Sequence, residues 1–428
     1  MAERIPRERA DCVVVGGGPA GSSAAEMFMK EAPDKRVILL EKRTRPHGTC
    51  AGGMGFNWLD EMQMKLPSHI VETDIHEVVV HGPTTEAVIS RKDLGVQSLG
   101  AVVDRWGFDE WLLCKAIALG ADVRRQHTFD DIKRDNGKWL VHAHNADGPY
   151  QIETDYVVDA SGPMAVVAKK LGFKVDEKPQ DIHVGLQYTV PLPEKIPLSQ
   201  LELWFQRDPV PSRPGGNWAC KTGYIWSFCT RHPYWDGDNP VKEGHLTRVG
   251  IGVDMEHNAI PGRSAKDCLE QFMREVPDYG GQGSILSENG GLIPTGVPLQ
   301  TAFENVFLAG DSGRHVSALH GGGIWFGRVA GEEAGRTAAK GGTAEDYDRS
   351  WKARIGWTLR VHYALKQVLY TLDNEEMDIM VSELGKFEVT TPNAMVEIPR
   401  AAMAVARHPV LGSKMALKTF LAMAKTGA

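Results

Sequence analysis

A glycine-rich turn near the N-terminus constrains the fold more than any other feature of this sequence. Residues 12–15 form a short apolar run that ends at glycine, so we predict a buried strand. Residues 22–30 contain helix formers, and a second apolar run at 37–40 ends in Glu41. Between the first strand and the helix lie three glycines with the spacing G-x-G-x-x-G: Gly16, Gly18 and Gly21. The order of strand, turn, helix and strand predicts the start of a parallel α/β sheet.

This arrangement is typical of a dinucleotide site. Gly16 permits the tight turn, Gly18 lets the backbone approach a pyrophosphate, and Gly21 lets the helix pack closely on the strand. The helix N-terminus presents N–H groups and a positive dipole end to the phosphates. Glu41, twenty positions after Gly21, can accept hydrogen bonds from ribose hydroxyls. The alternative is a glycine-rich turn that an acid follows by chance.

The length and charge of the chain exclude several classes of protein. A chain of 428 residues can hold two or three domains. Its net charge of -7, without a strongly basic block, argues against nucleic-acid binding. It contains no apolar run long enough for a transmembrane helix, and the charged N-terminus lacks the apolar core of a secretion signal. We therefore expect a cytoplasmic protein.

The six cysteines are scattered and include no C-x-x-C pair. This pattern excludes zinc ribbons and most iron–sulfur clusters, so we expect reduced thiols and no metal site. Cys50 lies in a loop of small residues that would let a ligand approach, although it could equally be an ordinary small loop residue.

Three later stretches place polar or glycine residues where ligands collect in such sheets. Asp159 follows a predicted strand in the sequence DASG, and Asp311 follows another in ENVFLAGD. The glycines at 321–323 precede a predicted helix at 324–340, whose N-terminus would face whatever Asp311 binds. Arg105 precedes a helix predicted from about Phe108 and could reach a phosphate. The alternative for Arg105 is a surface arginine.

Residues 182–254 change to a period of two, which predicts an antiparallel sheet. The region is rich in aromatic residues, and three of them, Tyr224, Trp226 and Phe228, fall on one face of their strand. One interpretation is an apolar wall for a large hydrophobic substrate, to which Tyr188 and Trp204 would also contribute. The other interpretation is an ordinary sheet core.

The chain from Glu345 onward is predicted to be helical. From Ile398 it mixes large apolar residues with lysine and arginine and contains no acids. Such a composition suits a pair of helices at a membrane surface. It also suits a solvated cationic face above a core stripe.

These pieces, in this order, resemble the flavoprotein monooxygenase-like superfamily, which has the glutathione-reductase-type FAD fold. Within it the chain is most similar to the geranylgeranyl reductase family. The resemblance rests on the turn at 16–21 with Glu41, on Asp104 and Arg105 before a helix, on DASG at 159–162, and on four longer motifs. These motifs are PHGTCAGGM at 46–54, GYIWSF at 223–228, VGIGVD at 249–254 and GDSGRHVSALHGGGI at 310–324.

The resemblance implies an α/β fold with a Rossmann-like FAD-binding domain, an inserted antiparallel β-sheet substrate domain and a helical C-terminal region. We expect the FAD-binding domain to comprise residues 1–73, 102–175 and 290–345. The substrate domain would comprise 74–101 and 176–289, and the helical region 346–428.

The resemblance also implies FAD as the cofactor and assigns residues to it. We expect FAD to contact the glycine turn, the adjoining acid and base, the loop cysteine, the arginine and the second glycine-rich segment: Gly16, Gly18, Pro19, Ala20, Gly21, Glu41, Lys42, Cys50, Arg105, Gly310, Asp311, Gly322, Gly323 and Ile324. Cys50 and His320 are the candidate catalytic residues, because a thiol or an imidazolium near the flavin could supply a proton. His320 stands where the family commonly has a small polar residue, so it could instead recognise a polar head group.

The activity implied is reduction of isolated double bonds in a prenyl chain by hydride transfer from reduced flavin. The partners would be a prenyl lipid, an electron donor that the sequence does not identify, and the membrane surface. The alternatives are an FAD-dependent monooxygenase or halogenase acting on an aromatic or hydrophobic substrate, and a flavoprotein that passes electrons to quinone.

Overall fold

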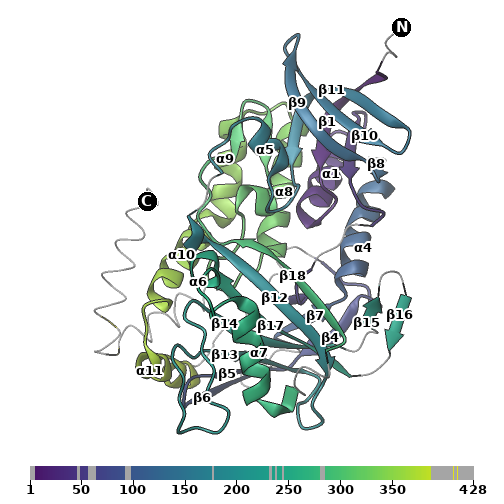
Figure 1. The fold of residues 1–428 in the computed structure, drawn as a ribbon. Helices are drawn as coiled ribbons and strands as arrows, with labels where there is room; N and C mark the ends of the chain where they lie inside the picture. The colour runs from purple at the N-terminus through teal and green to yellow at the C-terminus, as the bar shows by residue number, and fades with distance from the viewer. Residues whose placement is uncertain are drawn as a thin grey trace. The chain divides into compact units, whose positions relative to one another are not determined.

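The computed structural model describes residues 5–45, 49–55, 64–91, 98–175, 178–230, 234–236, 239–242, 245–279 and 285–386, with His408 and Gly412. Most of the basic segment from Ile398 lies outside these residues. The chain divides into two compact units (Figure 1). Unit 1 comprises Met1–Gly48, Trp106–Glu177 and Pro294–Arg360, and unit 2 comprises Thr49–Arg105, Lys178–Ile293 and Val361–Ala428.

Unit 1 is built on one sheet with a parallel centre. Its strand order is β19-β20-β11-β1-β2-β8, and the pairs from β20 to β8 are parallel. The strands are β1 (Arg7–Val15), β2 (Val37–Glu41), β8 (Asp122–Arg125), β11 (Gly148–Asp159), β19 (Ala302–Phe303) and β20 (Val306–Leu308). β1, β2 and β20 are buried along their apolar runs, as expected for strands covered on both faces. The predicted α/β class is confirmed.

A hairpin extends this sheet beside β11. β9 (Thr128–Asp135) pairs with β10 (Lys138–Asn145), and β10 pairs antiparallel with β11. The turn at Asn136 and Gly137 has positive φ at both residues, which the Asn-Gly pair tolerates and which matches the twist of a hairpin. An Asn-Gly pair between two alternating strands is a typical sequence signal for such a hairpin.

Glycines set the closest helix packing in unit 1. A Cβ atom at Gly331 of α8 would lie 2.1 Å from the carbonyl oxygen of Ala20 in α1. One at Gly335 would lie 2.1 Å from the carbonyl oxygen of Ala24. Only glycine at these two positions lets the helices approach this closely. The helices of unit 1 are α1 (Pro19–Glu31), α4 (Arg105–Ala118), α5 (Val166–Lys170), α8 (Ile324–Ala339) and α9 (Ala344–Trp351), and a π-helical turn, Lys352–Gly356, follows α9. α4 begins at Arg105, three residues before the predicted start.

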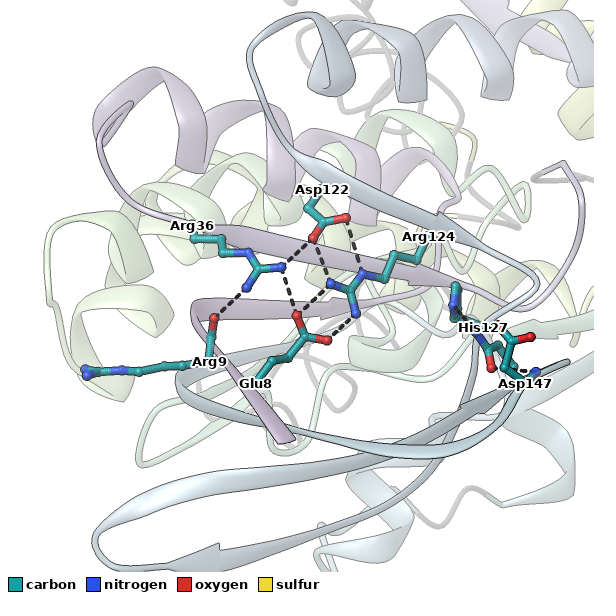
Figure 2. A network of polar contacts seen from close by, with 8 residues as sticks. Glu8, Arg9, Arg36, Asp122, Arg124, His127 and Asp147 are labelled. Atoms are coloured by element: carbon teal, nitrogen blue, oxygen red, sulfur yellow. Dashed lines mark hydrogen bonds and ion pairs between the residues drawn. The ribbon is translucent and has the colours of Figure 1, made fainter. Parts of the chain in front are cut away.

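An ion-pair network joins the amino ends of three neighbouring strands of unit 1 (Figure 2). Glu8 of β1 accepts hydrogen bonds from Arg124 of β8 and from Arg36, which precedes β2. Both arginines also contact Asp122 at the start of β8. Hydrogen bonding from Arg124 lowers the pKa of the Glu8 carboxyl, so the network is charged at neutral pH. The network holds together the amino ends of these strands. Ligands of such sheets bind at the opposite end, where the carboxyl ends of the strands lie.

Unit 2 is built on a seven-stranded sheet with the order β18-β12-β17-β14-β13-β5-β6. The pairs β12–β17, β17–β14, β14–β13 and β5–β6 are antiparallel, whereas β13 and β5 pair in parallel. The strands are β5 (Glu77–His81), β6 (Glu86–Ser90), β12 (Ile182–Pro191), β13 (Gln200–Trp204), β14 (Gly223–Thr230), β17 (Leu246–Asp254) and β18 (Ser287–Pro294). The predicted antiparallel sheet is confirmed.

Smaller elements surround this sheet. Two short sheets consist of β3 (Gly53–Gly55), β4 (Val71–Ile75) and β7 (Gly100–Val103), and of β15 (Tyr234–Asp236) and β16 (Asn239–Lys242). The helices are α6 (Met255–Asn258), α7 (Ala265–Glu275), α11 (Asn374–Gly385) and most of α10 (Trp357–Leu369). α7 begins at a capping box formed by Ser264 and Asp267 and packs on the sheet. Among the helices described, none has both the length and the hydrophobicity needed to cross a bilayer.

Candidate cofactor and substrate sites

The turn after β1 requires glycine at two of its motif positions. Gly16 has φ of 106°, and a Cβ atom there would lie 2.3 Å from the carbonyl oxygen of Ala160. A Cβ atom at Gly21 would lie 1.9 Å from the carbonyl oxygen of Gly16 itself. These are backbone contacts that no side-chain movement relieves. The first and third glycines therefore fix the turn and the start of α1.

Gly18 differs from its two neighbours in the motif because the fold does not require it. Its φ is -70°, and a Cβ atom there would meet nothing within 4 Å. It is the N-cap of α1, and no side chain caps the helix. With Pro19 and Ala20 following, the first N–H groups of α1 border an open cradle that a Cβ atom would fill. A pyrophosphate fits this cradle by both space and charge.

Glu41 closes the turn at the end of β2. Its Oε2 atom accepts a hydrogen bond from the Gly17 N–H at 2.8 Å, and Oε1 accepts one from the Arg43 N–H at 2.9 Å. Each carboxylate oxygen can accept a second hydrogen bond, so the buried acid retains capacity for ribose hydroxyls. Lys42, the next residue, is exposed.

The second glycine-rich segment lies against the first within unit 1. A Cβ atom at Gly310 would lie 2.8 Å from Cβ of Ala20, so the 3₁₀ turn Gly310–Gly313 touches the start of α1. The Asp311 carboxylate lies 3.1 Å from where Gly323 would carry a Cβ atom. Gly323 is the N-cap of α8, which also lacks a side-chain cap, and Ile324 begins the helix. Two helix N-termini and one carboxylate are thus brought together.

Asp159, expected among the ligand-binding residues from the DASG sequence, has a different role. Its Oδ1 accepts from the N–H and hydroxyl of Ser161, and its Oδ2 accepts from the N–H groups of Val167 and Ala168. The side chain is fully buried and caps α5. These four hydrogen bonds fix the start of α5, which gives Asp159 a structural role. Its position at a strand end therefore did not by itself identify a ligand-binding residue.

His320 lies in the turn before α8. Its Nδ1 accepts a hydrogen bond from the Gly322 N–H at 3.2 Å, which requires that nitrogen to be unprotonated. Burial lowers the pKa of the half-buried ring to about 4. His320 is therefore neutral at pH 7 and orients the glycine turn, whereas the sequence hypothesis used an imidazolium.

In unit 2 the strand β14 has an unusual distribution of side chains. Tyr224, Trp226 and Phe228 are only half-buried, whereas Ile225 and Cys229 on the opposite face are fully buried. The largest apolar side chains therefore lie on the more accessible face. An ordinary sheet core would show the reverse, because burial of aromatic area is what stabilises a core.

The strand register separates the five aromatic candidates. Tyr188 pairs across β17 with Val249, which pairs with Ser227, and Trp204 pairs with Ile225. Paired residues of antiparallel strands share a face, so Tyr188 and Trp204 lie on the buried face. There they join the core beneath α7, where Trp204 meets the rings of Phe272 and Tyr279. Sequence periodicity within single strands could not reveal this division.

The loop that carries Cys50 is anchored on the aromatic face. Gln187 Nε2 donates to the Thr49 carbonyl at 3.0 Å, and Arg248 Nη1 donates to the Ala51 carbonyl at 3.0 Å. Arg248 is itself held by a two-point ion pair with the buried Glu72. A Cβ atom at Gly53 would lie 2.1 Å from the Phe228 ring. Cys50 thus lies beside the aromatic residues within unit 2.

Arg105 is not a surface arginine, because only 8% of it is exposed. Its Nη1 donates to the Cys50 thiol. The Arg105 guanidinium therefore contacts Cys50. The sequence predicts that both residues lie near the cofactor. Cys50 itself is exposed.

Sequence reasoning missed three residues that shape these sites. Gly17 contributes the N–H that fixes Glu41, and Gln187 and Arg248 hold the Cys50 loop. A polar residue within a largely buried strand was a usable signal for the last two. Their partners, however, are far away in the sequence and become visible only with the strand register.

Comparison with known proteins agrees with this geometry. Residues 2–93 match the Thi4 family. The chain is 26% identical over 388 residues to a digeranylgeranylglycerophospholipid reductase of Methanocaldococcus jannaschii, covering 88% of this chain and 90% of that protein.

Solved structures share the fold. A geranylgeranyl bacteriochlorophyll reductase-like protein from Thermoplasma acidophilum superposes with a TM-score of 0.81 at 22% identity, over 96% of this chain and all of that one. A p-nitrophenol 4-monooxygenase from Pseudomonas putida gives a TM-score of 0.62 at 15% identity, over 98% of this chain and 99% of that one. The glycine cradle at Gly18, the two uncapped helix starts and these likenesses agree: the chain is an FAD-dependent oxidoreductase that is similar to the geranylgeranyl reductases.

Proposed function

We propose that this protein reduces isolated carbon–carbon double bonds in the prenyl chains of a lipid. The observation that carries the proposal is the partly exposed aromatic face of β14, formed by Tyr224, Trp226 and Phe228. Such a face can bind an extended apolar chain, because the area left accessible in the free protein is buried by the ligand. The relatives named as reductases of a digeranylgeranyl lipid support this substrate class.

In this proposal the residues of unit 1 hold the cofactor. The N-terminus of α1, from Gly18 to Gly21, binds the pyrophosphate and Glu41 binds the adenosine ribose. Asp311 accepts hydrogen bonds from the ribityl hydroxyls, and the turn before α8 donates the Gly323 N–H to the flavin ring. FAD, when bound and reduced, supplies the hydride that saturation of an alkene needs.

The second alkene carbon needs a proton, and we propose Cys50 as its source. The thiol lies in the loop anchored over the aromatic face and receives a hydrogen bond from Arg105. The hydrogen bond from the guanidinium fixes the position of the thiol in the loop. His320, neutral at pH 7, is proposed to orient the turn before α8, and this places it second as a proton source.

The test is turnover with a defined lipid. The purified holoenzyme is reduced with dithionite under anaerobic conditions and mixed with a glycerophospholipid that carries geranylgeranyl chains. We expect the lipid mass to rise by about 2 Da for each double bond reduced, and the flavin absorbance to return as substrate is consumed. An unchanged lipid with flavin that stays reduced contradicts the proposal.

Oxygen distinguishes the alternative activities that the wider fold supports. A monooxygenase or halogenase consumes oxygen in proportion to product, whereas the proposed reduction proceeds without it. Product formation that requires oxygen would therefore reassign the protein to that class.

We further propose that the enzyme works in the cytoplasm at the membrane surface, where a lipid substrate resides. Sedimentation with anionic and neutral vesicles tests this location. Binding to neither kind of vesicle contradicts it.

A further inference from the structure

Two polar groups on the aromatic face have no partner among the described residues. The Nε1 atom of Trp226 and the Oε1 atom of Gln187 are both inaccessible to solvent, and neither forms a hydrogen bond within the part of the chain that the structure describes. Gln187 is only 6% exposed. A buried polar group without a hydrogen bond costs about 1–3 kcal/mol, so two of them in one sheet call for an explanation.

The two groups belong to one place. Trp226 and Gln187 both pair with Gly250, on neighbouring strands of the sheet, and therefore share its face. A Cβ atom at Gly250 would lie 2.4 Å from the Trp226 ring and 2.7 Å from Cβ of Gln187. The glycine thus allows the indole and the amide side chain to meet above the strand.

The orientation of the Gln187 amide is determined by its other contact. Nε2 lies 3.0 Å from the carbonyl oxygen of Thr49, which can only accept a hydrogen bond. The amide nitrogen must therefore face Thr49, and the oxygen faces away from it. The two unpaired groups are therefore a donor, the Trp226 N–H, and an acceptor, the Gln187 oxygen.

We infer that Trp226 and Gln187 together bind one hydroxyl group at the aromatic face. A hydroxyl both accepts and donates, so one oxygen satisfies both side chains, whereas an ether or a keto oxygen satisfies only Trp226. The hydroxyl belongs either to a prenyl alcohol or to an ordered water held beside the alkene. This inference rests on the proposed function, because it adds a polar contact to the apolar substrate site proposed at the aromatic face.

The experiment compares two probes of equal chain length: geranylgeraniol and the corresponding hydrocarbon without the hydroxyl. Affinities are measured by equilibrium binding in mixed micelles, and anaerobic alkene reduction is measured alongside. The variants are Trp226→Phe, which keeps a ring and removes the N–H, and Gln187→Leu. Trp218→Phe serves as the control, because Trp218 packs on Phe272 in the core beneath α7. FAD content and thermal unfolding are recorded for each variant.

If the hydroxyl is the ligand's, the wild type and Trp218→Phe bind the alcohol about tenfold more tightly than the hydrocarbon, and both test variants lose that preference. If the hydroxyl is that of a bound water, the wild type binds the alcohol and the hydrocarbon equally well. Both test variants then slow alkene reduction about tenfold without a change in affinity. Equal binding of both probes together with undiminished reduction in both variants overturns the inference. Failure of every variant and the wild type to bind or reduce either probe would instead contradict the proposed function.

Discussion

The glycine turn of unit 1 and the aromatic face of unit 2, our candidate cofactor and substrate sites, show two different ways in which a sequence specifies a site. In the turn, the backbone itself makes the site, and Gly16 and Gly21 are dictated by contacts closer than any Cβ atom allows. On the aromatic face, side chains make the site, and their environment depends on which strands lie alongside. Local spacing is therefore sufficient to recognise the first site, whereas the second needs the register of the sheet.

The sharpest test of this contrast lies within the turn. Gly21→Ala places Cβ 1.9 Å from the Gly16 oxygen, so we expect loss of FAD and a stability loss of about 3 kcal/mol or more. Gly18→Ala, whose Cβ would meet nothing within 4 Å, should fold normally and still bind FAD poorly because the cradle is filled. Thermal unfolding and flavin absorbance after gel filtration separate the two outcomes. Wild-type FAD retention by Gly18→Ala contradicts the cradle.

The two faces of the unit 2 sheet can be separated in the same way. Trp204→Ala removes a ring from the core beneath α7 and should cost about 3–5 kcal/mol of stability. Trp226→Ala should cost less stability and should raise KM or lower kcat for a prenyl substrate, while flavin reduction by dithionite is unaffected. Denaturant unfolding and steady-state kinetics measure both effects. Intact kinetics in Trp226→Ala would identify β14 as an ordinary core strand.

Acid should weaken the folded protein through its buried histidines. Burial lowers the pKa of His315 to about 3 and that of His320 to about 4, both from 6.5. The unfolded chain takes up these protons first, so stability is full above pH 6.5 and falls as the pH drops toward those lowered values. Each histidine lowers the free energy of unfolding by at most about 1.4 kcal/mol for every pH unit crossed between its ordinary and its lowered pKa.

Urea unfolding between pH 7 and pH 4.5 measures this dependence. In His315→Leu, which removes the ring packed against Trp351, the curve should be flatter. The same slope in the variant and the wild type would show that His315 is not the titrating group.

The smallest expected effect concerns proton transfer. Cys50→Ala should slow reoxidation of the photoreduced enzyme by substrate at least about tenfold, or about 1.4 kcal/mol of barrier, with FAD content unchanged. His320→Ala should have the smaller kinetic effect, because its ring is neutral at pH 7. Single-turnover absorbance measures both rates. Wild-type rates in both variants would leave water or the substrate as the proton source.

Much of the architecture could be predicted from local pattern. The strands β1 and β2, the hairpin at Asn136-Gly137 and the helix after the glycines at 321–323 follow from periods and turn residues that act within a few positions. The spacing from Gly16 to Glu41 also predicted the glycine turn, because each motif residue acts on backbone nearby in the sequence.

Only the tertiary structure decided how distant side chains are used. It assigned Asp159 to capping α5, moved Tyr188 and Trp204 into the core beneath α7, and neutralised His320 by burial. It also placed Gln187 beside Trp226 and the Cys50 loop above them. The physical reason is that the burial of a side chain and the identity of its partners depend on strand pairing between distant segments, whereas a backbone turn depends on its own residues.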